Sequence, residues 1–103
     1  MVRWSENLYL SDGIDPKKKR KLQKAIENEK LTFEVYCITI ASNPNNLFDI
    51  INVNELLFRY YSRKDMFILG LARSKEEANL LVKDMIEEIY NKTGAFQVRE
   101  YFV

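Results

Sequence analysis

Residues 66–94 have the sequence MFILGLARSKEEANLLVKDMIEEIYNKTG, and this stretch decides the fold. Its first seven residues are a continuous apolar run, which is typical of a central strand covered on both faces. Apolar residues then recur at helical spacing, with Tyr90 at the end of the apolar stripe. The stretch therefore predicts a strand over 66–72 and, after a short turn, a helix over 75–92 that packs on it.

The ends of this helix carry their own signals. Ser74 is a good N-cap residue, and Glu77 three positions later completes a capping box. Gly94 supplies the glycine that commonly follows a helix C-terminus. Glu88 and Lys92 form a favourable charge pair one turn apart. Capping, charge pairing and apolar spacing thus agree on a single strand–turn–helix unit.

The rest of the chain predicts further strands and a helix. A short strand is expected near the N-terminus, and Asp15 with Pro16 begins a helix that runs to about residue 30. Residues 31–41 alternate and are rich in β-branched and aromatic side chains, which predicts a strand. Residues 95–103 also alternate and predict an edge strand at the C-terminus.

Residues 47–61, LFDIINVNELLFRYY, fit two patterns. Nearly every position of a helical template is apolar here, so we expect a helix, bent near 52–54. The residues from Ile51 to Asn54 have poor helix propensity, which favours an alternative. In that alternative, 47–53 is a strand followed by a helical turn.

These elements alternate along the chain, which predicts an α/β fold. We expect one small domain over 1–103, with a sheet of three to four mainly parallel strands flanked by three helices. If 47–53 is a strand, a ferredoxin-like α+β sandwich becomes the better prediction. The chain of 103 residues, 47% of them hydrophobic, is long enough to bury the core of one domain.

The composition excludes several classes of protein. The sequence has no histidine and one cysteine, Cys37. These counts exclude Ser-His-Asp and Cys-His catalysis, a Cys/His zinc site within one chain and an internal disulfide. We therefore expect no catalytic residue, no metal and no cofactor. No apolar run approaches the about 20 residues of a membrane span, so we expect no membrane partner. With a single cysteine, a reducing cytoplasm is the simplest compartment to expect.

The candidate polyanion-binding residues are a run of five cations: Lys17, Lys18, Lys19, Arg20 and Lys21. They occupy the first turns of a predicted helix, where the helix dipole favours anions. Nucleic acid or another polyanion would explain the run, but a solvated helix face explains it without any partner. Only Trp4 and Tyr9 lie nearby for stacking on bases, so we favour the solvated face.

The candidate ligand-binding residues stand where predicted strands end: Ser42, Asn43, Asn46, Arg73 and Ser74. If strands 31–41 and 66–72 are parallel neighbours joined by a helix over 46–60, these side chains share one rim of the sheet. Free backbone N–H groups at two helix starts and the Arg73 guanidinium would then suit a phosphate or carboxylate.

Two functions follow from these patterns. The first is a small intracellular binding or assembly module without catalytic activity, which could pair with a second copy of itself through the C-terminal edge strand. The alternative is a ligand-sensing or enzymatic domain that binds a small anion at the carboxyl ends of its strands.

Overall fold

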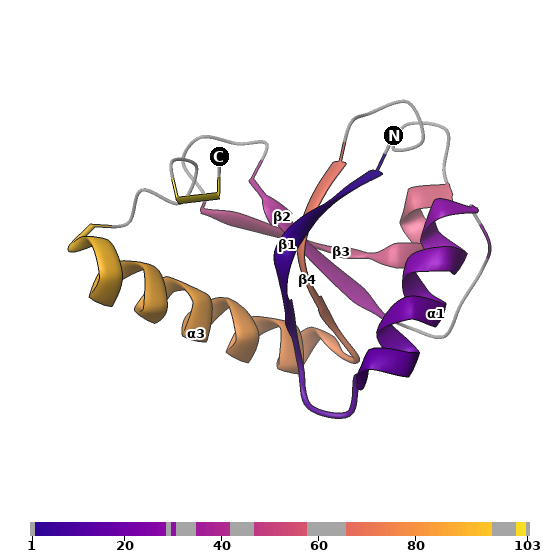
Figure 1. The fold of residues 1–103 in the computed structure, drawn as a ribbon, viewed down its shortest axis with the longest axis horizontal. Helices are drawn as coiled ribbons and strands as arrows, with labels where there is room; N and C mark the ends of the chain where they lie inside the picture. Colours follow the sequence, from indigo (N-terminus) through magenta and orange to yellow (C-terminus); the bar gives the residue numbers. More distant parts are fainter. Residues whose placement is uncertain are drawn as a thin grey trace.

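The computed structural model describes residues 2–28, 30, 35–41, 47–57, 66–95 and 101–102. Its elements in chain order are β1 (Val2–Leu10), α1 (Pro16–Glu27), β2 (Tyr36–Ile40), β3 (Phe48–Asn52), the 3-10 helix η1 (Val53–Leu57), β4 (Met66–Ala72) and α3 (Lys75–Thr93). The four strands form one sheet in the order β1-β4-β2-β3 (Figure 1). Since β4 has a neighbour on each side, the predicted central strand is confirmed.

The sheet is mixed rather than mainly parallel. β1 pairs with β4 in parallel, whereas β2 pairs with both β4 and β3 in antiparallel orientation. The described residues contain two α-helices, α1 and α3, and not the three that the sequence predicted. The mixed α/β class is therefore confirmed, while the expected strand directions and helix number are wrong.

Both errors come from the stretch 47–61, of which the structure describes 47–57. Over these described residues the strand β3, followed by η1, lies where a helix was expected, as in the alternative interpretation. Ile50 packs on the face of the sheet that α3 covers, and Ile51 packs on the opposite face. A strand that is apolar on both faces lacks a clear two-residue period, so its apolar positions also matched a helical template. The Asn52 side chain ends β3 by accepting a hydrogen bond from the backbone N–H of Asn54 (3.0 Å).

The two helices lie on opposite faces of the sheet (Figure 1). Ile26 and Leu22 of α1 join a core cluster with Cys37 of β2. Met85 of α3 joins a second cluster with Ile38, the next residue of β2. The strand expected in the ferredoxin-like alternative is present. Its helices, however, are not gathered on one face as in a two-layer α+β sandwich.

The predicted helix over 75–92 is confirmed as α3. Ser74 is its N-cap, and Gly94 ends it in the left-handed conformation (φ 73°). Met85 and Ile89 are fully buried against the sheet. The expectation that Tyr90 extends the buried stripe is wrong, because this side chain is 47% exposed.

Only part of the predicted C-terminal strand can be compared with the structure. Residues 96–100 and 103 lie outside the described residues. Tyr101 and Phe102 are helical, not extended, and Phe102 packs into the core cluster beside α3. Neither residue therefore offers the strand edge that the predicted self-pairing required.

The Cys37 thiol should be unreactive in the native protein. It is fully buried, and this burial raises its pKa to about 12. Because the thiolate is the reactive species, an aromatic disulfide reagent at about pH 8 should label the protein only after unfolding in urea. Labelling of the native protein at the rate of the unfolded chain would contradict this placement.

The raised pKa of Cys37 also predicts how the stability of the protein depends on pH. The unfolded thiol ionises near its ordinary pKa of 9.0, whereas the folded thiol resists ionisation. The contribution of the protonated Cys37 thiol to the free energy of unfolding is therefore complete below about pH 9, and it is lost as the pH rises towards the pKa of the folded state. Urea titrations across this range should show the decline, and a variant Cys37→Ala should show less of it.

Candidate binding cleft

The N-terminal strand β1 leaves the sheet for several residues and then returns. Trp4 pairs with Ile68 of β4, and the next paired residue, Tyr9, lies opposite Gly70. The four residues of β1 between them thus stand opposite Leu69 alone, which makes a wide bulge. Bulges of this kind are common beside binding sites, because they redirect side chains and release backbone groups from the ladder.

Gly70 allows β1 to return to the sheet. A Cβ atom at this position would lie 3.1 Å from the carbonyl oxygen of Tyr9 and 3.3 Å from its Cβ. The close neighbour at Gly70 is therefore the backbone of β1.

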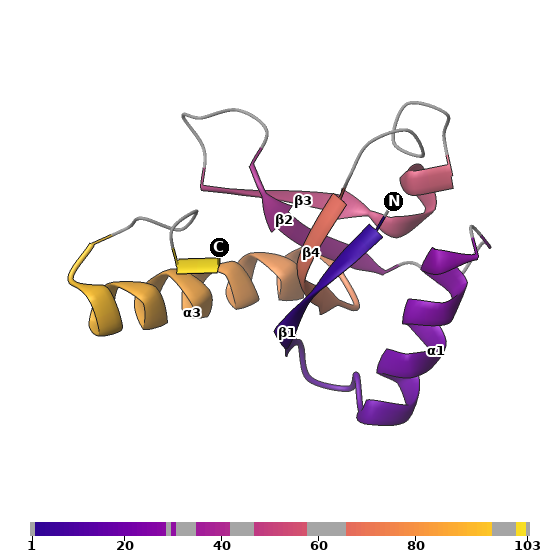
Figure 2. The same ribbon diagram turned by 45° about the horizontal axis from the view of Figure 1, so that its top comes forward.

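A cleft of about 960 Å³ opens between the bulge, α3 and the C-terminal residues. Figures 1 and 2 show the helical residues at the C-terminus, in yellow, beside α3. The cleft is lined by Trp4, Ser5, Glu6, Asn7, Leu8, Tyr9, Phe67, Glu88, Lys92, Tyr101 and Phe102. Five of these residues are aromatic, and they come from three separate parts of the chain.

A chain of polar contacts crosses the cleft. The Lys92 ammonium lies 2.9 Å from a Glu88 carboxylate oxygen and 3.4 Å from the Tyr101 hydroxyl. The hydrogen bond from Lys92 is the main reason why the pKa of Glu88 is lowered, and a hydrogen bond from Tyr9 adds to it. Burial, followed by the hydrogen bond to Glu88, raises the pKa of Tyr9 well above its ordinary value.

The aromatic rings pack edge to face. The ring centroid of Phe102 lies 6.2 Å from that of Tyr9 and 5.0 Å from that of Tyr101. The Arg3 guanidinium lies over the ring of Phe67 at 5.2 Å. The Trp4 side chain packs instead into the core cluster on the α1 face, where its buried Nε1 has no hydrogen-bond partner among the described residues. The cleft thus combines aromatic walls with a few fixed polar groups.

The pKa shifts of Glu88 and Tyr9 bear on one kind of chemistry, proton transfer. At neutral pH the Glu88 carboxylate is ionised and the Tyr9 phenol is protonated, since both pKa values move away from neutrality. A general acid or base works best with a pKa near the working pH. The pKa shifts of Glu88 and Tyr9 therefore move both groups away from the range in which a general acid or base works best.

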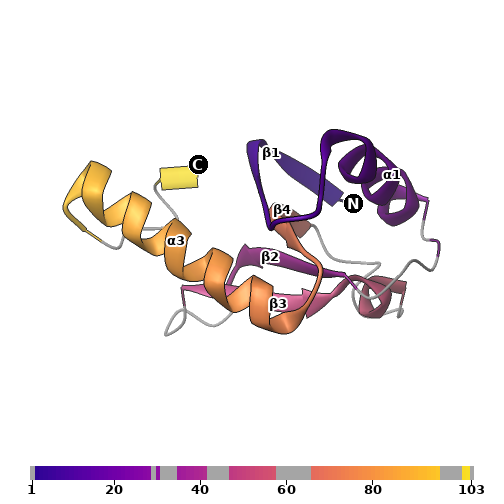
Figure 3. The same cartoon turned by 90° about the horizontal axis from the view of Figure 1, so that it is seen from below.

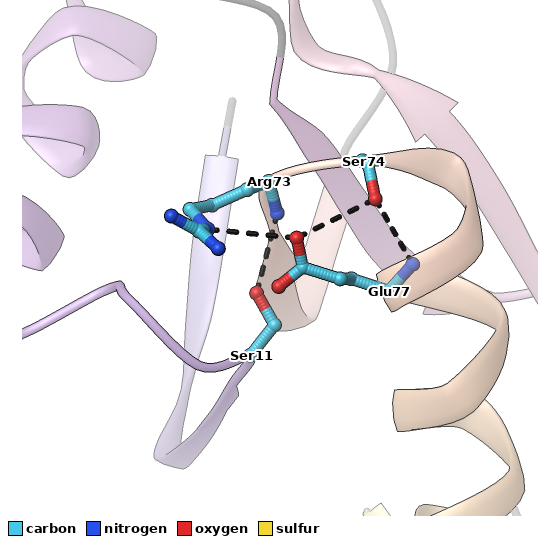
Figure 4. Close-up of polar contacts among 4 residues, drawn as sticks. All are labelled: Ser11, Arg73, Ser74 and Glu77. Atoms are coloured by element: carbon cyan, nitrogen blue, oxygen red, sulfur yellow. Dashed lines mark hydrogen bonds and ion pairs between the residues drawn. The ribbon is translucent and has the colours of Figure 1, made fainter.

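The predicted anion ligands Arg73 and Ser74 are engaged in structural contacts (Figure 4). Ser74 Oγ accepts a hydrogen bond from the Glu77 N–H at 3.1 Å, and the Arg73 Nε lies 3.5 Å from the Glu77 carboxylate. The Arg73 N–H donates to Ser11 Oγ at 3.2 Å, which joins this turn to the end of β1. An added anion would meet the negative charge of Glu77, so binding at Arg73 stays a prediction.

The other predicted anion ligands, Ser42, Asn43 and Asn46, lie outside the described residues. Their expected proximity to Arg73 depended on a parallel pairing of β2 and β4. That pairing is antiparallel, with Tyr36 opposite Ala72. The carboxyl end of β2 therefore lies at the opposite end of the sheet from Arg73, and the argument for a shared rim fails.

The predicted polyanion run lies on the first turns of α1. Lys19 is half-buried and the other four cations of 17–21 are exposed. The helix is started by Asp15, whose carboxylate accepts a hydrogen bond from the Lys18 N–H (2.8 Å). Polyanion binding by the run stays a prediction. The run is also separate from the cleft, since no residue of 17–21 lines it.

Sequence patterns did not reveal the cleft. The Glu88–Lys92 pair was predicted as a helix-surface pair, and Tyr9 and Trp4 were noted only as possible stacking residues. The one local signal is Ser5-Glu6-Asn7, a polar interruption between Trp4 and Leu8 in a strand whose other residues, apart from Arg3, are apolar or aromatic. Such an interruption marks a bulge only when the register of the partner strand is known.

Among the described residues, no group of three acidic, cysteine or histidine side chains could hold a metal ion. No helix in this part of the chain is long and apolar enough to cross a membrane. Comparisons with protein-family models, with curated proteins and with solved structures found no match.

Proposed function

We propose that this protein is a non-catalytic binding module that takes a flat, apolar group of its ligand into the cleft between β1 and α3. The observation that carries this proposal is the wide bulge of β1 facing the Glu88–Lys92 pair across a wall of aromatic rings. A volume of about 960 Å³ lies at the upper end of the range for small-molecule sites, roughly 300–1,000 Å³.

The chemistry of the lining supports a ligand with an aromatic ring and a polar edge. Rings such as Tyr101 and Phe102 favour offset or edge-to-face contacts with another ring. Glu88 and Lys92 offer an acceptor and a donor on the same side of the cleft. The backbone groups of residues 5–8 add further hydrogen-bonding positions, since the bulge separates them from the ladder of β4.

A fragment screen tests the proposal. Flat aromatic fragments with one donor or acceptor are screened against the intact protein by saturation-transfer NMR, and hits are titrated. Tyr101→Ala should weaken the hits roughly tenfold, in line with the energy of an aromatic contact. The matched control Leu80→Ala should leave their affinities unchanged, since Leu80 is 63% exposed on α3 and does not line the cleft.

Two results would overturn the proposal. One is a screen in which no fragment binds at about millimolar concentration. The other is a set of hits whose affinities fall equally in both variants.

A further inference from the structure

Helix α3 carries a second surface, on the side turned away from the sheet. Its 19 residues extend beyond the strands at the C-terminal end of the helix (Figures 1 and 3). Two large apolar side chains of α3 are exposed to solvent, Leu80 (63%) and Tyr90 (47%). With 3.6 residues per turn, Leu80, Lys83, Glu87 and Tyr90 fall within roughly 80° of one another around the helix axis. We call these four residues the outer stripe.

The two charges of the outer stripe are not paired with each other. Lys83 and Glu87 are one turn apart, yet the ion pairs found among the described residues do not include them. Glu88 and Lys92, four positions apart in the reverse order, do pair at 2.9 Å. This difference agrees with helix energetics, because an acid that precedes a base by four residues pairs better than the reverse order. Lys83 and Glu87 are thus available for an intermolecular contact.

The order of the outer stripe is self-complementary. Lys83 and Glu87 lie two positions on either side of position 85, and Leu80 and Tyr90 lie five positions on either side of it. In an antiparallel pair of helices related by a two-fold axis at this level, residues equally far from the centre face each other. Lys83 then meets Glu87 of a second copy, and Leu80 meets Tyr90, twice each. A two-fold interface requires such a self-complementary patch.

We propose that the outer stripe is a self-association surface, through which two copies of this chain pair with their α3 helices antiparallel. The charges set the orientation, since a parallel pair would place Lys83 beside Lys83 and Glu87 beside Glu87. Leu80 and Tyr90, at the two ends of the outer stripe, supply the apolar area that the pairing buries. One helix face is a small interface, so the dimer is weak, with a dissociation constant of roughly 10–1,000 µM. This surface is separate from the cleft, because none of its residues lines it.

Sedimentation equilibrium of charge variants tests the pairing directly. The wild-type protein should show a monomer–dimer equilibrium up to about 1 mM. Lys83→Glu alone and Glu87→Lys alone should each weaken it about tenfold, since each change creates two like-charge contacts. The double variant should recover the wild-type dissociation constant. An equimolar mixture of the two single variants should form a heterodimer, because every facing pair is then of opposite charge.

Thermal unfolding serves as the control, since all variants should melt close to the wild type. A wild-type protein that stays monomeric throughout this range would overturn the proposal. So would a dimer that is indifferent to the single variants, as expected for pairing through a strand edge, and so would a double variant no better than the single ones.

Discussion

Met85→Ala is expected to lower the free energy of unfolding by about 2–5 kcal/mol, the usual cost of truncating a fully buried side chain. Met85 is 0% exposed and packs with Ile38 and Leu69 where α3 crosses the sheet. Urea unfolding followed by circular dichroism measures the change.

The matched control is Leu80→Ala on the same helix. Leu80 is 63% exposed, so its truncation should change stability by less than about 0.5 kcal/mol. Equal effects of the two substitutions would mean that α3 does not pack on the sheet through the face described above.

Gly70→Ala is expected to cost about 1–3 kcal/mol by overpacking. The added Cβ would meet the backbone oxygen of Tyr9 at 3.1 Å, and a backbone atom cannot move aside as a flexible side chain can. The strain should act on the pairing of β1 with β4. Amide hydrogen exchange at Tyr9 and Leu10 should therefore accelerate more than exchange in β2.

Gly94→Ala is the control for Gly70→Ala, because it tests the effect of backbone conformation without a steric contact. Gly94 has a positive φ of 73° and no atom within 4 Å of an added Cβ, so Ala there brings only backbone strain, roughly 1–2 kcal/mol. Its effect should be confined to the end of α3. If Gly70→Ala left exchange in β1 unchanged, the close approach of the two strands would be contradicted.

The strand–turn–helix unit of residues 66–94 was predictable because its signals are local. The apolar run, the Ser74 cap and the Gly94 terminus all act within a few residues of the chain, and the structure has all three. The N-terminal helix was predictable for the same reason, since Asp15 and Pro16 begin it.

The strand directions were not predictable, because the alternation of elements depended on residues 47–61. A strand covered on both faces and a buried helix give similar apolar patterns over so short a stretch. Once β3 replaces the expected helix, β2 and β3 become a hairpin, and β2 runs antiparallel to β4. The predicted anion site at Arg73 assumed that β2 and β4 are parallel. Because they are antiparallel, the argument that brought Ser42, Asn43 and Asn46 near Arg73 no longer holds.

The cleft depends on contacts between distant parts of the chain. Tyr9, Glu88 and Tyr101 come together only through the register of β1 on β4 and the packing of the C-terminal residues against α3. The spacing of residues within one segment cannot predict that these three side chains lie close together. Glu88 and Lys92 were predicted as a pair, but nothing local shows that a tyrosine lies on each side of it.

The amide resonances of residues 5–9 and of Glu88, which line the cleft, test the proposed binding most directly. The side chain of Trp4, the one tryptophan of the sequence, packs into the core cluster on the α1 face, so its single indole signal in the ¹H–¹⁵N spectrum serves as an internal reference. Titration with the tightest aromatic fragment should shift the amides of residues 5–9 and Glu88 while the indole signal changes less. A fragment that binds while these amides stay in place, and shifts amides elsewhere instead, would contradict binding in the cleft.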